Sequence, residues 1–162
     1  MLFCERLTFQ EVEMYKVTIY TDGACLGNPG AAGIGVVLVC SGHKKEISQY
    51  IGQGTNNIAE IKAVIAALSC LKHPEKTYVQ LYTDSQWVVG VLSQNWKIKK
   101  NVKLVEEAKK LAAKVAKLDV VKVKGHAGNE FNELADRLAR DAIKKLQESV
   151  SCSMKTLLKE NK

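Results

Sequence analysis

The chain has 162 residues, of which 46% are hydrophobic and 25% charged, a composition that excludes collagen-like, mucin-like and wholly disordered proteins. Its longest apolar run, residues 31–40, is far shorter than the roughly 20 residues of a membrane helix, and residues 1–15 lack the apolar core of a secretory signal. The net charge of +7 is concentrated in residues 97–124, which hold ten lysines and three acids. Such a basic segment fits either a polyanionic partner or a solvated helix face.

The cysteines are scattered along the chain and form no C-x-x-C pair, which disfavours zinc and redox motifs. Isolated cysteines of this kind suit a reducing compartment, where they pack as small apolar residues. We therefore expect a cytoplasmic protein. The cysteines are Cys4, Cys25, Cys40, Cys70 and Cys152.

The chain is predicted to begin with three consecutive antiparallel strands. Residues 16–21 alternate between apolar and polar side chains and predict a strand, and the glycine-rich residues 22–30 predict a structured loop. Residues 32–40 form an apolar, β-branched run, and residues 44–51 follow it as a partner strand across the turn signal at residues 41–42.

The middle of the chain alternates between helix and strand. Asn56 or Asn57 is a suitable N-cap for a helix whose apolar residues recur at helical spacing until Pro74 ends it. Residues 78–83 predict a short strand between turn signals, and residues 84–92 predict a shorter helix that opens at its aspartate.

The last part of the chain is predicted to contain two helices and one strand. Residues 101–118 carry apolar side chains on one side and lysines on the other, as in an amphipathic helix. Residues 119–124 alternate as a strand, residues 125–129 form a loop, and residues 130–146 form the final helix.

The predicted order β-β-β-α-β-α-α-β-α belongs to the α/β class. It implies a five-stranded mixed sheet whose first three strands are antiparallel, flanked by helices. All of these elements lie in one domain over residues 16–146, with an N-terminal tail over 1–15 and a C-terminal tail over 147–162.

Four acidic residues occupy positions that favour chemistry. Asp22 and Asp84 lie at predicted strand ends, where α/β sheets tend to carry their sites, and Glu60 and Asp136 lie in otherwise apolar helices. Singly, each has a structural explanation: a turn, a helix cap, a favourable place at a helix N-terminus, or an ion pair between Asp136 and Arg140. If the four converge, an oxygen-only cluster of carboxylates suits Mg²⁺ or Mn²⁺.

Four sequence blocks resemble the type 1 ribonuclease H family. They are Thr-Asp-Gly-Ala-Cys-Leu-Gly-Asn-Pro-Gly at 21–30, Thr-Asn-Asn-Ile-Ala-Glu at 55–60, Thr-Asp-Ser-Gln at 83–86, and the stretch 124–136, which opens with Lys-Gly-His-Ala-Gly and closes with Asn-Glu-Leu-Ala-Asp. The resemblance covers roughly residues 16–146. It implies a ribonuclease H-like fold and an endonuclease that hydrolyses the RNA strand of RNA–DNA hybrids with two metal ions, leaving 5′-phosphate and 3′-hydroxyl ends.

The resemblance also implies the catalytic and metal-binding residues. Asp22 would bridge two Mg²⁺ ions, with Mn²⁺ as a substitute, while Glu60 and Asp84 complete the ligands of one ion and Asp136 helps to hold the other. His126, in a glycine-rich loop, would assist proton movement or product release. A solvent-exposed loop histidine is the alternative explanation for that residue.

Further residues match positions that hold the substrate in the family. Gly23 and Cys25 would lie near the RNA 2′-hydroxyls, and Thr55 would contact a DNA phosphate. Trp96 and Asn101 would line the channel of the DNA strand. Turn and cap chemistry is the alternative for the amides, and core packing for the tryptophan. The amides suited to minor-groove base edges and sugars are Asn28, Asn56, Asn57 and Gln86.

The chain departs from the family pattern in two respects. The basic helix and loop that many bacterial members insert after the Asn-Trp-Lys block is absent, and the lysines of residues 97–103 are expected to compensate for it electrostatically. Residues 1–15 are too few for a separate hybrid-binding domain. We expect a monomer that binds RNA–DNA hybrid and no membrane. The alternatives are a non-catalytic hybrid-binding module and a related metal-dependent nuclease acting on duplex DNA.

Overall fold

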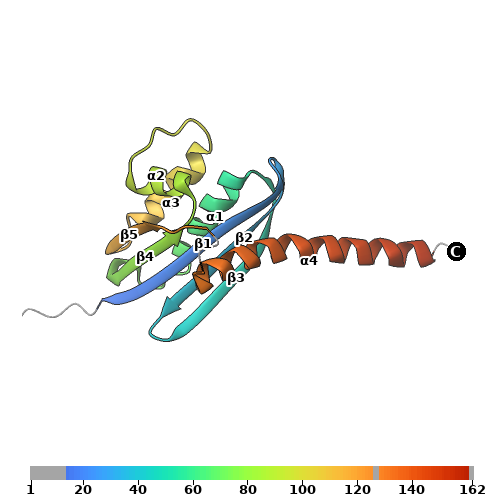
Figure 1. The fold of residues 1–162 in the computed structure, drawn as a ribbon, viewed down its shortest axis with the longest axis horizontal. Coiled ribbons are helices and arrows are strands. Elements are labelled where there is room, and N and C mark those ends of the chain that lie inside the picture. Colours follow the sequence, from blue (N-terminus) through green and yellow to red (C-terminus); the bar gives the residue numbers. More distant parts are fainter. Residues whose placement is uncertain (1–13, 126–127, 161–162) are drawn as a thin grey trace, which may run out of the picture.

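A computed structural model describes residues 14–125 and 128–160 of the chain. Five strands form one sheet in the order β3-β2-β1-β4-β5 (Figure 1). The pairs β1–β2 and β2–β3 are antiparallel, and the pairs β1–β4 and β4–β5 are parallel, which confirms the predicted mixed sheet. The strands are β1 (Tyr15–Gly27), β2 (Gly30–Cys40), β3 (His43–Gly54), β4 (Thr77–Thr83) and β5 (Lys117–Lys122).

Helices cover both faces of the sheet, as the element order predicted (Figure 1). The helix α1 (Asn56–Ser69) packs against β1 and β2, and α2 (Gln86–Ser93) and α3 (Val102–Ala112) pack against α1. The helix α4 (Glu130–Glu160) crosses β1, β2 and β3 on the opposite face. In the described part of the chain, no helix combines the length and the hydropathy that a membrane span requires.

The main core lies between the sheet and α1. Ile19, Val64 and Leu81 are fully buried there, and successive residues of β4 alternate between buried and half-buried, as a strand with one covered face requires. A second apolar cluster joins α1, α2 and α3 through Ile61, Val105 and their neighbours. The apolar periodicity of the sequence therefore places α1 between the sheet and α3.

The strand β1 is longer than predicted. Residues 22–27, expected to be part of a loop, continue the strand and pair with β2 as far as Gly27 and Gly30. The pairing of β1 with β4, in contrast, ends at Tyr20 and Tyr82. Because β1 runs on beyond the end of β4, Asp22 stands inside a strand but at the point where its parallel neighbour has stopped.

The two predicted N-caps differ by one or two residues from those observed. Thr55, rather than Asn56 or Asn57, caps α1 by accepting a hydrogen bond from the backbone N–H of Ile58. Ser85, rather than the preceding aspartate, caps α2. Both hydroxyl residues have the extended backbone that a cap needs, and the predicted Asn56 lies in the first turn of the helix.

The ends of α3 and α4 also differ from the prediction. Residues 113–118 were expected to be helical, but residues 117 and 118 pair with β4, so backbone pairing in the sheet outweighs their helix propensity. The helix α4 continues to Glu160 instead of ending at residue 146 and extends beyond the sheet (Figure 1). Residues 147–160, expected to be a tail, lack glycine and proline and are helical.

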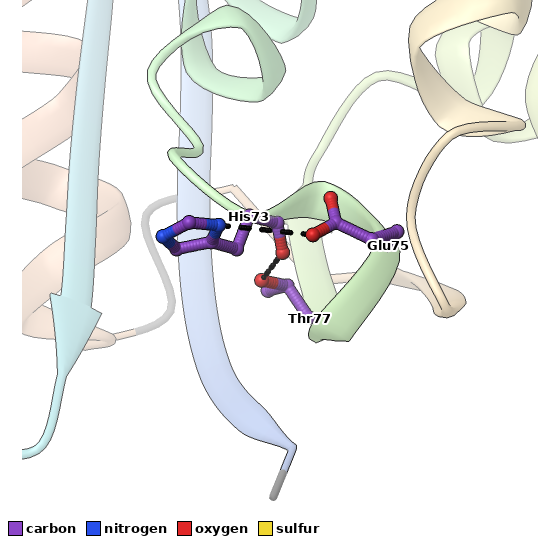
Figure 2. A network of polar contacts seen from close by, with 3 residues as sticks. All are labelled: His73, Glu75 and Thr77. Atoms are coloured by element: carbon purple, nitrogen blue, oxygen red, sulfur yellow. Dashed lines mark hydrogen bonds and ion pairs between the residues drawn. The ribbon is translucent and has the colours of Figure 1, made fainter. Parts of the chain in front are cut away.

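A short 3₁₀ turn, η1 (Pro74–Lys76), leads from α1 into β4 (Figure 2). The hydroxyl of Thr77 donates a hydrogen bond of 2.7 Å to the carbonyl oxygen of His73, and His73 Nδ1 lies 3.7 Å from a carboxylate oxygen of Glu75 (Figure 2). These contacts hold the start of β4, at the opposite end of that strand from Asp84.

Candidate active site

Three of the four predicted acids lie together where β4 ends. Asp22 of β1, Glu60 of α1 and Asp84, the residue after β4, each offer a carboxylate oxygen, and these oxygens lie within 4.8 Å of one another. Asp22 and Glu60 are each only 7% exposed. Such close, buried carboxylates repel one another and are costly unless protonated or bound to a cation.

Glycine residues allow the elements that carry these acids to approach closely. A Cβ atom at Gly23 would overlap the backbone nitrogen of Glu60, so only glycine lets α1 lie this close to β1. The N–H of Gly23 also donates a 2.7 Å hydrogen bond to Oδ1 of Asp22. A Cβ at Gly125 would lie 2.9 Å from Oδ2 of Asp84, which places the segment after β5 against the same cluster.

The electrostatics of the cluster favour the protonated acids. Burial, followed by the negative charges of Asp84 and Asp136, raises the pKa of Asp22 from its ordinary value of 3.8 to about 7. Burial and then the charges of Asp22 and Asp84 raise the pKa of Glu60 well above its usual range. Oε2 of Glu60 has no hydrogen-bond partner among the described residues. A buried, under-bonded set of hard oxygen donors fits a divalent cation such as Mg²⁺ or Mn²⁺.

Asp136 approaches the cluster from α4 on the other side of the sheet. Its Oδ2 lies 2.9 Å from a guanidinium nitrogen of Arg140, so the ion pair considered from the sequence is present. Asp136 nevertheless lines the same cavity as the three other acids, and its charge contributes to the raised pKa of Asp22. The ion pair and a place in the acidic site are therefore compatible.

A cavity of about 540 Å³ opens over the four acids. Its walls come from β1, the first turns of α1 and α2, and α4, which are far apart in the sequence. Five of the residues predicted to hold substrate line this cavity. They are Gly23, Cys25, Asn56, Asn57 and Gln86.

Two other predicted substrate residues support the rim of the cavity. Oδ1 of Asn28 accepts a hydrogen bond of 3.1 Å from the backbone N–H of Asn56, which ties the β1–β2 turn to α1. Thr55 caps α1 through its hydroxyl. The N-cap role, which was the alternative explanation for Asn56, therefore belongs to its neighbour Thr55.

Trp96 and Asn101 lie apart from the cavity, in the segment between α2 and α3. The indole of Trp96 packs against Gly90 of α2, and the residue remains 44% exposed. Asn101 has a left-handed backbone with φ of 58° just before α3. The DNA-strand contacts predicted for these two residues would therefore lie on a second surface. His126 lies outside the described residues.

Sequence reasoning did not assign two residues of α4 that line the cavity, Asn132 and Arg140. Asn132 is 3% exposed, and its Oδ1 has no hydrogen-bond partner among the described residues. Both residues are four positions from Asp136, which puts all three on one face of the helix. The four-residue spacing from Asp136 is the feature of the sequence that could have identified both residues.

A comparison with known families agrees with the motif blocks. The sequence model of the family described as RNase H matches residues 14–144. A ribonuclease H of Acetivibrio thermocellus is 43% identical over 146 residues, which cover 82% of this chain and 97% of that protein.

Solved structures give the same result for the fold. The N-terminal RNase H domain of a Mycobacterium tuberculosis protein is 34% identical, with a TM-score of 0.67 over 79% of this chain and 98% of that one. LC11-RNase H1, isolated from compost, has been solved in complex with an RNA/DNA hybrid. That complex is 31% identical, with a TM-score of 0.68 over 81% of this chain and 99% of that one.

Proposed function

Since the chain belongs to the RNase H family, we propose that it is an endonuclease that hydrolyses the RNA strand of RNA–DNA hybrids. The observation that carries this proposal is the cluster of buried Asp22 and Glu60 with half-buried Asp84, whose carboxylate oxygens lie within 4.8 Å of one another. A protein that only bound nucleic acid would gain nothing from bringing together three acids, two of them buried, that repel each other and a polyanion. A relative solved with a hybrid supports the choice of substrate.

The four acids are proposed to hold two divalent cations, Mg²⁺ or Mn²⁺. Asp22, in the middle, would contact both, with Glu60 and Asp84 completing the ligands of one and Asp136 those of the other. Two such ions supply activation of the attacking water and stabilisation of the leaving 3′-oxygen. The products would carry 5′-phosphate and 3′-hydroxyl ends.

The remaining residues are proposed to hold and orient the hybrid. The backbone around Gly23 and Cys25 would lie against the RNA 2′-hydroxyls, and the amides at the cavity would face the minor groove. Thr55 would contact a DNA phosphate, and Trp96 and Asn101 would receive the DNA strand on the α2–α3 segment. His126 would assist proton movement or product release.

We further propose that the enzyme acts as a monomer in the cytoplasm. The described cysteines, Cys25, Cys40 and Cys70, are free thiols, as a reducing compartment requires. Among the described residues, β1, α1, α2 and α4 of a single chain supply the walls of the cavity.

The test is a cleavage assay on labelled RNA–DNA hybrid, duplex RNA, single-stranded RNA and duplex DNA. Each substrate is incubated with Mg²⁺, with Mn²⁺ and with a chelator. We expect metal-dependent cutting of the hybrid's RNA strand alone. Binding of the hybrid without cutting would favour a non-catalytic module, and cutting of duplex DNA would identify a related nuclease of different specificity.

A further inference from the structure

A second, smaller cavity of about 250 Å³ adjoins the acidic site. It lies between the distal part of β1 and α4, and three of its residues also line the acidic cavity. The shared residues are Ala24, Cys25 and Arg140. The remaining residues are Leu26 from β1 and Ile143, Lys144 and Gln147 from α4.

The charge of this second cavity is opposite to that of the first. The two charged residues among the described ones that line it are Arg140 and Lys144, both cations. They are four residues apart on α4, so they lie on one face with Lys144 about 6 Å further along the helix axis. Their side chains are 61% and 72% exposed, so both are accessible to a ligand.

The wall opposite these cations is apolar and held in place. Leu26 is 54% exposed at the end of the β1–β2 hairpin, and the thiol of Cys25 donates a hydrogen bond to the carbonyl oxygen of Gly54. Asn28 fixes the same hairpin to the start of α1. An apolar wall facing two cations suits a sugar–phosphate backbone, with the sugar against Leu26 and the phosphate against the cations.

We propose that this cavity binds a phosphate of the RNA strand beside the one that is cut, through Arg140 and Lys144. This inference rests on the proposed hybrid cleavage. The cavity adjoins the acidic site and shares Arg140 with it, so the strand that it would hold is the strand that the acids are proposed to act on. If Asp136 held a divalent cation, the guanidinium of Arg140, now in a 2.9 Å ion pair with Asp136, would be available to bind phosphate oxygens with its planar fork.

Lys144 provides the cleaner test, because among the described residues its ion pair is with Glu148 at 3.9 Å and not with an acid of the site. Lys144→Ala is expected to raise KM for the hybrid about tenfold and to leave kcat within about twofold. It should also reduce the slope of log K against log salt by about one, as expected for one phosphate. The matched control is Lys145→Ala, which removes the same charge about 100° around the helix, outside the cavity.

Arg140 is tested in the same way, with Arg137 on the same helix as the control position. Arg140→Ala should raise KM more than Arg137→Ala, and Arg140→Lys should recover only part of the loss because lysine lacks the planar fork. Arg140→Ala also frees Asp136, so its kcat is expected to change as well. Thermal unfolding of each variant verifies that the fold is retained.

Shortening the RNA strand locates the phosphate. A series of hybrids with a single cut site is prepared, in which the RNA strand is shortened by one nucleotide at a time, from its 5′ end in one series and from its 3′ end in another. The KM of the wild-type protein should rise to that of Lys144→Ala at the length where the bound phosphate is removed, and the two proteins should coincide at shorter lengths.

The outcomes separate this inference from the proposed function. If the wild-type protein does not cut the hybrid, the proposed function fails. If it cuts, but Lys144→Ala behaves like Lys145→Ala at every RNA length, the second cavity does not bind the RNA strand and the inference is overturned.

Discussion

At Asp22, the needs of the proposed catalytic role oppose those of stability. Burial and the neighbouring charges of Asp84 and Asp136 raise the pKa of its carboxyl group to about 7. The residue therefore resists ionisation in the free protein, although its proposed role requires the ionised form. A cation supplies the compensating charge, so cation binding and protein stability should be linked at this residue.

Replacing Asp22 by asparagine is expected to abolish hybrid cleavage, with a loss of at least about 100-fold, because the change removes the central negative charge of the cluster. The side chain keeps nearly the same size, so the fold should be retained. Cleavage rates and far-UV circular dichroism measure the two properties. Cleavage at the wild-type rate would contradict the proposed metal site.

The same variant should be more stable than the wild-type protein at pH 8 in the presence of a chelator. Because the pKa of Asp22 is higher in the folded state than its ordinary 3.8, its protonation favours folding, and this contribution is lost as the pH rises through about 7. The Tm of Asp22→Asn should therefore exceed that of the wild-type protein at pH 8 by about 2–4 °C for each kcal/mol relieved.

Two comparisons control this measurement. The difference in Tm between Asp22→Asn and the wild-type protein should shrink towards pH 5, where the wild-type carboxyl is protonated. Added Mg²⁺ at pH 8 should raise the Tm of the wild-type protein more than that of the variant. A difference in Tm that is independent of pH would mean that Asp22 titrates normally.

At the scale of the elements, the site depends on how closely two helices approach the sheet. Gly23 admits α1, and Gly33 and Gly35 of β2 admit α4, because a Cβ atom at any of the three would overlap helix backbone. Gly35 pairs with Asp22 across the β1–β2 ladder and lies beneath Ala135, the residue before Asp136. The spacing between α4 and the sheet thus determines how near Asp136 comes to Asp22.

Gly35→Ala is expected to destabilise the protein by about 1–3 kcal/mol, because the new methyl group would overlap the carbonyl oxygen of Ala135. It should also lower kcat, since a displaced α4 moves Asp136 away from the other acids. Thermal unfolding and single-turnover cleavage measure these effects. The matched control is Gly54→Ala, whose methyl group would make an ordinary contact of 3.4 Å with Ile58. Equal effects of the two changes would contradict the close approach of α4.

At the scale of the whole molecule, charge is segregated. The acids of the site lie in a cavity at the end of β4, while the excess of seven lysines lies in residues 97–124. Lysines in this segment flank Trp96 and the start of α3, and those at 99, 100 and 103 are exposed. These lysines would attract the hybrid to the protein even though the acids of the site repel its phosphates.

Neutralising Lys99, Lys100 and Lys103 together is expected to weaken hybrid binding and to reduce the dependence of log K on log salt, by about one for each phosphate that is no longer neutralised. Binding is measured by fluorescence anisotropy in Ca²⁺ between low and moderate salt concentrations. The chain offers a control of equal charge at Lys44, Lys72 and Lys76, which are exposed and lie outside the basic segment. If both triple variants lose the same affinity, the basic segment is only a solvated surface.

Local patterns in the sequence were sufficient for the order of the elements, and they singled out four acids that the fold brings to one cavity. Alternation and helical spacing are properties of neighbouring residues, so the strands around Ile19 and Leu81 and the helix carrying Glu60 were predicted correctly. The boundaries of the strands and helices were less predictable. Residues 22–27 form a strand because they pair with β2, and residues 117 and 118 belong to the sheet because they pair with β4.

What the sequence determined by itself was therefore the set of acids, the sheet and the basic segment. Only the tertiary structure placed Asp22 beyond the end of β4, brought Asp136 to the same cavity as the other acids and opened a second cavity beside Lys144. These features arise where β1 meets β4 and α4, which follow it far along the chain. Their geometry depends on how closely a helix packs on a sheet, and no pattern of neighbouring residues encodes that distance.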